Sequence, residues 1–263
     1  MTPAEAYDSI LQFSPVSDRS EEAARSAVEC AQALVASVGG KSFGWSRRQK
    51  REGLLDEQIR ILRRHAGSLV FPGIQIASQG EHDVWREDYS DIVHKLTNQA
   101  EFGFVVDQES DNRRNKLALR QALPSEYLLR LGTQNVAFGD AITLQGIQAG
   151  RIPAILTAQP YVDQGRPSQE DIHAFFAQCG FIRLPDDMMM QLYSSKPFWY
   201  RPSDNILVAD ANPENFSRID DDIIVPIDLI THPMDASILH STAQQNGINL
   251  DHVIQSATDY LIG

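Results

Sequence analysis

The chain has 263 residues, of which 42% are hydrophobic and 22% charged, a composition typical of globular proteins and unlike that of disordered chains. Its formal net charge of −12 disfavours general binding to nucleic acid or to anionic lipid. The N-terminus has no signal-peptide pattern, and no apolar run approaches the roughly 18 residues of a membrane span. The cysteines, Cys30 and Cys179, form no metal-binding spacing, so we expect buried or neutral thiols in a cytoplasmic protein with no membrane partner.

Residues 1–66 are predicted to form a helical N-terminal extension. Apolar residues recur at helical spacing over 20–38, and a second helix is expected over 54–65. The basic cluster RRQKR at 47–51 precedes the second helix. A solvated loop face is the simpler interpretation of this cluster, and an anion or nucleic-acid contact is the sharper one.

Residues 67–160 predict a small antiparallel sheet with one helix. The polar segment 109–119 is expected to be a loop or excursion, and a helix is expected over 124–138, with Pro124 in its first turn. Short apolar runs separated by polar breaks predict the strands, which are expected at 69–71, 74–77, 83–85, 92–96, 102–106, 141–147 and 153–158.

A second, mainly helical region is predicted over residues 161–263, and the boundary between the two regions lies within the connector QPYVDQGRPS at 159–168. Ser168 is expected to cap a helix that Gly180 ends. The aromatic and Met-rich segment 186–201 favours packing in a core or an interface over a cofactor site. One more helix is expected near the end of the chain, over 249–261.

Two strand-like runs in this second region each lead to an aspartate. Asp210 follows the run at 206–208, and Asn215 comes five residues after it. Asp228 follows the run at 223–227, thirteen residues after Asn215. Carboxylate and amide oxygens are ligands that Mg²⁺ accepts, and a carboxylate at a strand end can receive a proton. This spacing therefore predicts a catalytic site.

The order of these features resembles a protein kinase fold. Kinase catalytic loops place an Asn five residues after an Asp and a metal-binding Asp further along. More closely, the chain resembles the serine/threonine/tyrosine kinase-like domain of polyvalent proteins from phages and conjugative elements. The motifs that carry this resemblance, over about residues 74–235, are GEHDV at 80–84, AQPYV at 158–162, ADANPEN at 209–215 and PIDLI at 226–230.

The resemblance implies an α+β, bilobal kinase-like fold: an N-terminal extension over 1–66, a small-sheet N-lobe over 67–160 and a compact helical C-lobe over 161–263. It implies ATP and Mg²⁺ as cofactors. In the C-lobe, Asp210 would orient the acceptor hydroxyl, and Asn215 and Asp228 would bind the metal.

The N-lobe residues would bind the nucleotide. Lys95 would contact the α- and β-phosphates, held by Glu126 on the following helix, with Glu101 as the alternative. Gly80 would cover the phosphates, because glycine allows close approach of the backbone. His82 would touch phosphate or be a structural histidine, and the segment from Gln159 to Tyr161 would meet the adenine.

The sequence also departs from the kinase pattern. Val208 stands where kinases have the histidine of the catalytic loop, so apolar packing must hold the loop here. Asn212 replaces the lysine that contacts the transferred phosphate in many kinases. Leu229 and Ile230 follow the metal aspartate in place of Phe and Gly, and no Ala-Pro-Glu segment follows.

The leading hypothesis is an ATP- and Mg²⁺-dependent phosphotransferase that acts on an unknown protein or small-molecule acceptor, with nucleic acid not expected as a partner. Asn212 and the single glycine of the turn favour the alternative of a pseudokinase or nucleotide-binding interaction module. A third hypothesis is transfer of the nucleotide monophosphate by the same fold.

Overall fold

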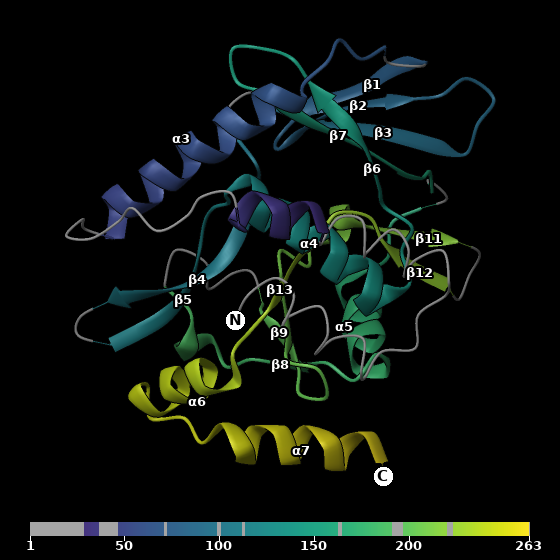
Figure 1. Cartoon of the computed structure of the whole chain (residues 1–263). Coiled ribbons are helices and arrows are strands. Elements are labelled where there is room, and N and C mark those ends of the chain that lie inside the picture. Colours follow the sequence, from purple (N-terminus) through teal and green to yellow (C-terminus); the bar gives the residue numbers. More distant parts are fainter. Residues whose placement is uncertain are drawn as a thin grey trace. The chain divides into compact units, whose positions relative to one another are not determined.

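The computed structural model describes residues 29–36, 47–70, 73–98, 101–111, 114–162, 165–190, 197–219 and 223–262 (Figure 1). The chain is of mixed α and β structure with antiparallel sheets, and it divides into two compact units. The first unit holds the described residues up to Phe104 and from Gln121 to Tyr161. The second unit holds the described residues from Val105 to Arg120 and from Val162 onward.

The first unit is built on a five-stranded antiparallel sheet in the order β1-β2-β3-β7-β6. A helix at 29–36 and the helices α3 and α4 complete it. Helices α3 and α4 are joined by buried Gln58, whose side chain donates to Ser125 Oγ and accepts from the Ser125 amide, both at 3.0 Å. The elements of this unit are α3 Arg47–His65, β1 Ile74–Gln79, β2 His82–Arg86, β3 Ile92–Thr97, α4 Pro124–Phe138, β6 Thr143–Gln148 and β7 Ala154–Pro160.

The second unit contains a four-stranded antiparallel sheet in the order β13-β10-β9-β8 and two separate hairpins, β4-β5 and β11-β12. Its apolar core combines Val106 and Leu117 of the first hairpin with Leu207 of β10 and Leu239 of α6. The elements are β4 Phe104–Asp111, β5 Arg114–Gln121, α5 Gln169–Gln178, β8 Ile182–Arg183, η1 Asp186–Met188, β9 Trp199–Arg201, β10 Ile206–Ala209, η3 Pro213–Asn215, β11 Phe216–Ile219, β12 Ile223–Pro226, β13 Ile230–Pro233, α6 Ala236–Gln245 and α7 Leu250–Ile262.

Local signals explain where α4 and α5 begin and end. Helix α4 starts with Pro124, whose missing N–H costs nothing in a first turn, and ends at Gly139, which has a left-handed φ of 72°. Ser168 caps α5 by accepting from the Asp171 amide, while the Asp171 carboxylate accepts from the Ser168 amide at 2.8 Å. Both predicted helices are confirmed.

Other predicted elements differ from the structure. The basic cluster at 47–51 lies within helix α3 and not in a loop. The predicted loop at 109–119 is most of the β4-β5 hairpin, and a further helix, α6, precedes the predicted final one. Within the strand predicted at 69–71, the described residues 69–70 are not in a strand. Of the helix predicted over 20–38, only 29–36 lies within the described residues, and it is helical there.

The Met-rich segment contributes to the core, as predicted. Met188 is 0% and Met189 1% exposed, and both belong to the apolar core of the second unit. The part of this segment at 191–196 lies outside the described residues. Among the helices of the described ranges, none has the length and apolar character needed to cross a lipid bilayer.

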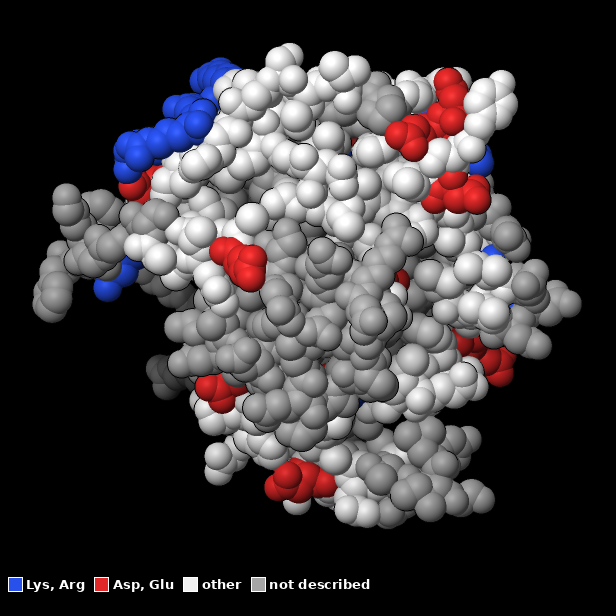
Figure 2. Space-filling model, turned by 45° about the vertical axis from the view of Figure 1, so that its right-hand side comes forward, with Lys and Arg blue, Asp and Glu red and all other residues white. Residues whose placement is uncertain are grey.

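Helix α3 concentrates positive charge on an acidic chain. Its last turn carries Arg63, Arg64 and His65, which suit the negative end of a helix dipole. Arg60, one turn earlier, pairs with Glu57. In Figure 2, Lys and Arg side chains gather at the upper left with an acidic group at their edge, and other Asp and Glu side chains are scattered over that face.

Candidate functional site

Asp210 lies directly after β10 in the second unit, with a backbone φ of 60°. A left-handed conformation is uncommon for residues other than glycine, and such conformations cluster at functional sites. Two amides hold the carboxylate: Asn212 Nδ2 donates to Oδ1 at 2.8 Å, and Asn215 Nδ2 donates to Oδ2 at 3.0 Å. Asn215 Nδ2 also donates to the Asp210 carbonyl at 2.7 Å. The turn is therefore fixed by hydrogen bonds to the candidate catalytic residue itself.

The orientation of the Asn215 amide follows from these hydrogen bonds. Because Nδ2 donates to Asp210, the opposite atom of the amide is Oδ1, an oxygen acceptor. Among the described residues, the structure records no hydrogen-bond partner for this oxygen. An amide oxygen that accepts no hydrogen bond is a suitable ligand for a hard cation such as Mg²⁺.

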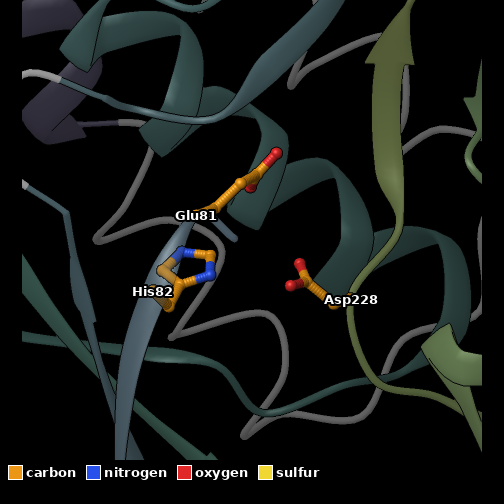
Figure 3. A group of neighbouring side chains, drawn as sticks. All are labelled: Glu81, His82 and Asp228. Atoms are coloured by element: carbon orange, nitrogen blue, oxygen red, sulfur yellow. The ribbon is translucent and has the colours of Figure 1, made fainter. Parts of the chain in front are cut away.

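Asp228 belongs to the same unit and lies in the short segment between β12 and β13, where Figure 3 draws its carboxylate. The preceding residue, Ile227, donates its amide to the Asn215 carbonyl at 2.8 Å. Asp210, Asn215 and Asp228, which the sequence predicted as one site, thus belong to neighbouring segments tied by backbone and side-chain hydrogen bonds. Asp228 is half-buried, as are Asp210 and Asn215.

Apolar packing supports the Asp210 loop, as the sequence predicted from the valine at position 208. Val208 is 0% exposed in β10, where it pairs with Trp199 of β9 and Thr231 of β13. Leu229, directly after Asp228, is also 0% exposed. Both strand ends that carry the aspartates are therefore anchored in the core of the second unit.

Lys95 lies on β3 in the first unit and is only 8% exposed. Its strand is central, so Lys95 pairs with Val84 of β2 on one side and with Thr157 of β7 on the other. Lysine is almost never so buried unless it has a partner. The structure thereby excludes the simpler interpretation that Lys95 is a solvated lysine on a sheet surface.

A carboxylate that sequence reasoning missed, Asp140, interacts electrostatically with Lys95. Asp140 follows the Gly139 cap of α4, and Gln134 Nε2 donates to its Oδ2 at 2.7 Å. Burial raises the pKa of the Asp140 carboxyl to about 7, against the lowering effects of the Gln134 hydrogen bond and the Lys95 charge. A carboxylate at a helix C-terminus is unfavourable because that end of the helix dipole is negative. This unfavourable position was the signal by which the sequence could have marked Asp140 as a candidate functional residue.

The two acids that sequence reasoning assigned to Lys95 lie elsewhere in the first unit. Glu126 is in the first turn of α4, where its Oε2 accepts from the Leu123 amide at 2.7 Å and caps the helix. Glu101 is exposed before β4. Pairing of Lys95 with either acid stays a prediction.

The glycine turn between β1 and β2 is anchored to its own unit. Gly80 has a left-handed φ of 66°, and an added Cβ would meet nothing within 4 Å. Glu81 pairs with buried Arg130 of α4 at 2.7 Å, and His82 Nε2 lies 2.9 Å from the Tyr127 hydroxyl. Figure 3 shows Glu81 and His82 next to each other where the turn enters β2. Because His82 is 5% exposed and hydrogen-bonded, the structure favours a structural histidine.

The connector begins along β3. Gln159 is 9% exposed and lies opposite Val93, while the Tyr161 amide donates to the Asp91 carbonyl at 2.8 Å. The Arg86 guanidinium lies 4.0 Å from the centre of the Tyr161 ring. The Tyr161 amide is thus engaged within its own unit, and a contact of this segment with adenine stays a prediction that must use other groups.

Comparisons with known proteins provide no relative. The chain matches no protein-family model, no curated protein and no solved structure. Any functional conclusion therefore rests on two groups of residues. One is the buried Lys95 with the Asp140 carboxyl, which interacts with it electrostatically. The other is the set of Asp210, Asn215 and Asp228.

Proposed function

We propose that this chain is an ATP- and Mg²⁺-dependent phosphotransferase with a kinase-like arrangement, in which the first unit serves as the N-lobe and the second as a compact C-lobe. The observation that carries the proposal is the Asp210 turn. Asp210 adopts a left-handed conformation, and the Asn215 amide is oriented with its nitrogen toward Asp210 and its oxygen available for a cation. The acceptor is an unidentified protein or small molecule.

In the proposed reaction, the acceptor hydroxyl oxygen attacks the terminal phosphorus of ATP and gives its proton to Asp210. The bond between that phosphorus and the bridging oxygen breaks, and ADP leaves. The amides of Asn212 and Asn215 fix the carboxylate that would receive the acceptor proton.

The donor set fits Mg²⁺, because the Asp228 carboxylate and the Asn215 Oδ1 are hard oxygen ligands. A bound Mg²⁺ would supply charge neutralisation on the phosphates. Lys95 would contribute positive charge to the α- and β-phosphates, with Asp140 as the acid that positions its ammonium group.

The remaining predicted contacts complete the proposed nucleotide site. Gly80 would bring the backbone of its turn over the phosphates, and the open space around it is compatible with this role. His82 would hold the glycine turn in position through its hydrogen bond with Tyr127. The segment from Gln159 to Tyr161 would meet the adenine ring.

A nucleotide-binding interaction module without transfer is the second candidate, and Asn212 favours it. Its side chain donates to Asp210 in the position where many kinases carry a lysine for the transferred phosphate. The missing positive charge would leave the transition state less stabilised than in those kinases.

The first experiment measures binding of ATP with Mg²⁺ by isothermal titration. Asp228→Asn should weaken binding by at least the roughly tenfold that loss of a supporting group costs a metal site. The matched control is Asp251→Asn, which makes the same change on a side chain that is 84% exposed. If the unaltered chain does not bind ATP with Mg²⁺, both candidate functions are wrong.

In the second experiment, the chain is incubated with labelled ATP and a cell extract that supplies candidate acceptors. Label transfer that Asp210→Asn abolishes and Asp251→Asn preserves would support the phosphotransferase. Binding without transfer would support the interaction module. The intact mass of a modified product distinguishes addition of a phosphate from addition of a nucleotide monophosphate, the third hypothesis.

A further inference from the structure

The first unit contains a second candidate binding site, a cavity of about 380 Å³. Its walls come from the helix at 29–36, from α3 and α4, and from β6 and β7. Every lining residue within the described ranges belongs to the first unit. The lining residues are Cys30, Ala33, Leu34, Ile61, Leu62, His65, Leu128, Leu144, Ile147 and Ile155.

The size and the lining of this cavity match those of small-molecule pockets. Small-molecule pockets occupy roughly 300–1,000 Å³ and are lined mainly by apolar side chains. At about 30 Å³ for each water-sized group, the cavity holds on the order of a dozen heavy atoms. Its wall of Leu, Ile and Ala side chains selects an apolar body.

The polar groups of the described wall are confined to two residues. Cys30 is half-buried and His65 is exposed at the end of α3. His65 is the one basic side chain among the described wall residues, and its ring nitrogens can donate a hydrogen bond at this end of the cavity. A ligand with an anionic group would find its complement there, while its apolar part lies against Leu128 and Ile155.

We propose that this cavity binds a small amphipathic molecule, with an apolar body of roughly medium-chain fatty-acid size and one anionic group at the His65 end. Binding here is independent of the proposed nucleotide site, because Lys95 and the Asp210 turn contribute nothing to the wall. The hydrophobic effect supplies most of the affinity, and His65 sets the orientation of the ligand.

Cys30 is a built-in reporter for this site, and Cys179, in the second unit, is its internal control. Both thiols are half-buried, and burial raises the pKa of each. The rate at which iodoacetamide alkylates each thiol is measured by peptide mass spectrometry, with and without decanoate below its micelle concentration. We expect decanoate to slow alkylation of Cys30 several-fold and to leave Cys179 unchanged. Unchanged Cys30 alkylation at millimolar decanoate, or equal slowing at both thiols, would overturn the site.

Ligand and sequence variants then test the chemistry of recognition. Octanoate, two methylenes shorter, should bind roughly tenfold more weakly than decanoate. Ala33→Trp, at an exposed wall position, should fill the cavity and abolish protection of Cys30, with the fold checked by circular dichroism. His65→Ala should weaken the binding of decanoate but not that of decan-1-ol. If His65→Ala binds decanoate as tightly as the unaltered chain does, His65 does not recognise the anionic group.

Discussion

The half-buried Asp140 supports a prediction about stability that does not depend on any activity. Its carboxyl has a pKa raised from 3.8 to about 7, chiefly by burial. Between pH 3.8 and about pH 7, the folded chain therefore binds more protons than the unfolded chain does. The free energy of unfolding falls as pH rises through this range, because its slope with pH follows the difference in bound protons. Three pKa units at about 1.4 kcal/mol each give a loss of about 4 kcal/mol.

Asp140→Asn removes this titration and keeps an oxygen that can accept from Gln134. We expect the free energy of unfolding of Asp140→Asn, relative to that of the unaltered chain, to rise by about 4 kcal/mol between pH 4 and pH 8 and then level off. Urea unfolding followed by circular dichroism across this range measures the difference. Other carboxylates titrate in both proteins and cancel.

The control is Asp251→Asn, which makes the same change on a side chain that is 84% exposed. Parallel stability curves for Asp140→Asn and the unaltered chain would refute the reasoning, because they would mean that Asp140 ionises as readily in the folded state as in the unfolded state.

Three further predictions concern the fold that holds the two groups, each measured by urea unfolding. Ser168→Ala should lower the free energy of unfolding by about 1 kcal/mol, since it removes the cap of α5. Leu207→Ala should cost about 2–5 kcal/mol, because Leu207 is 0% exposed in the strand that leads to Asp210. Tyr127→Phe removes the hydrogen bond to buried His82 and should cost about 1 kcal/mol, whereas Tyr89→Phe, at a fully exposed ring, should cost nothing measurable. An unchanged midpoint for Tyr127→Phe would contradict the structural role given to His82.

The Asp210 turn shows how a departure from the expected motif can become part of the site. Asn212 stands where many kinases have a lysine, and in the structure its amide donates to the Asp210 carboxylate at 2.8 Å. Val208 stands where kinases have a histidine, and it is fully buried in β10. Both substitutions exchange a charged or titratable group for a neutral support, so the carboxylate of Asp210 is fixed by amides and the loop by apolar contacts.

Elements with strong local signals could be predicted from the sequence. The bounds of α4 follow from Pro124 and Gly139, and those of α5 from the Ser168 cap, because these residues act on the backbone within one turn of themselves. The hairpin formed by β4 and β5 was missed because its polar composition is typical of a loop. It forms strands because Val106 and Leu117 share the core of the second unit with Leu207 and Leu239, which lie far from them in the chain.

The candidate site divides in the same way. The sequence alone determined the set of Asp210, Asn215 and Asp228, because the spacing of strand ends and turns is a local property of the chain. Only the tertiary structure decided that Lys95 is buried and that the Asp140 carboxyl interacts electrostatically with it. Burial and electrostatic interactions depend on which strands and helices pack together, and residues 45 positions apart carry no local mark of that interaction.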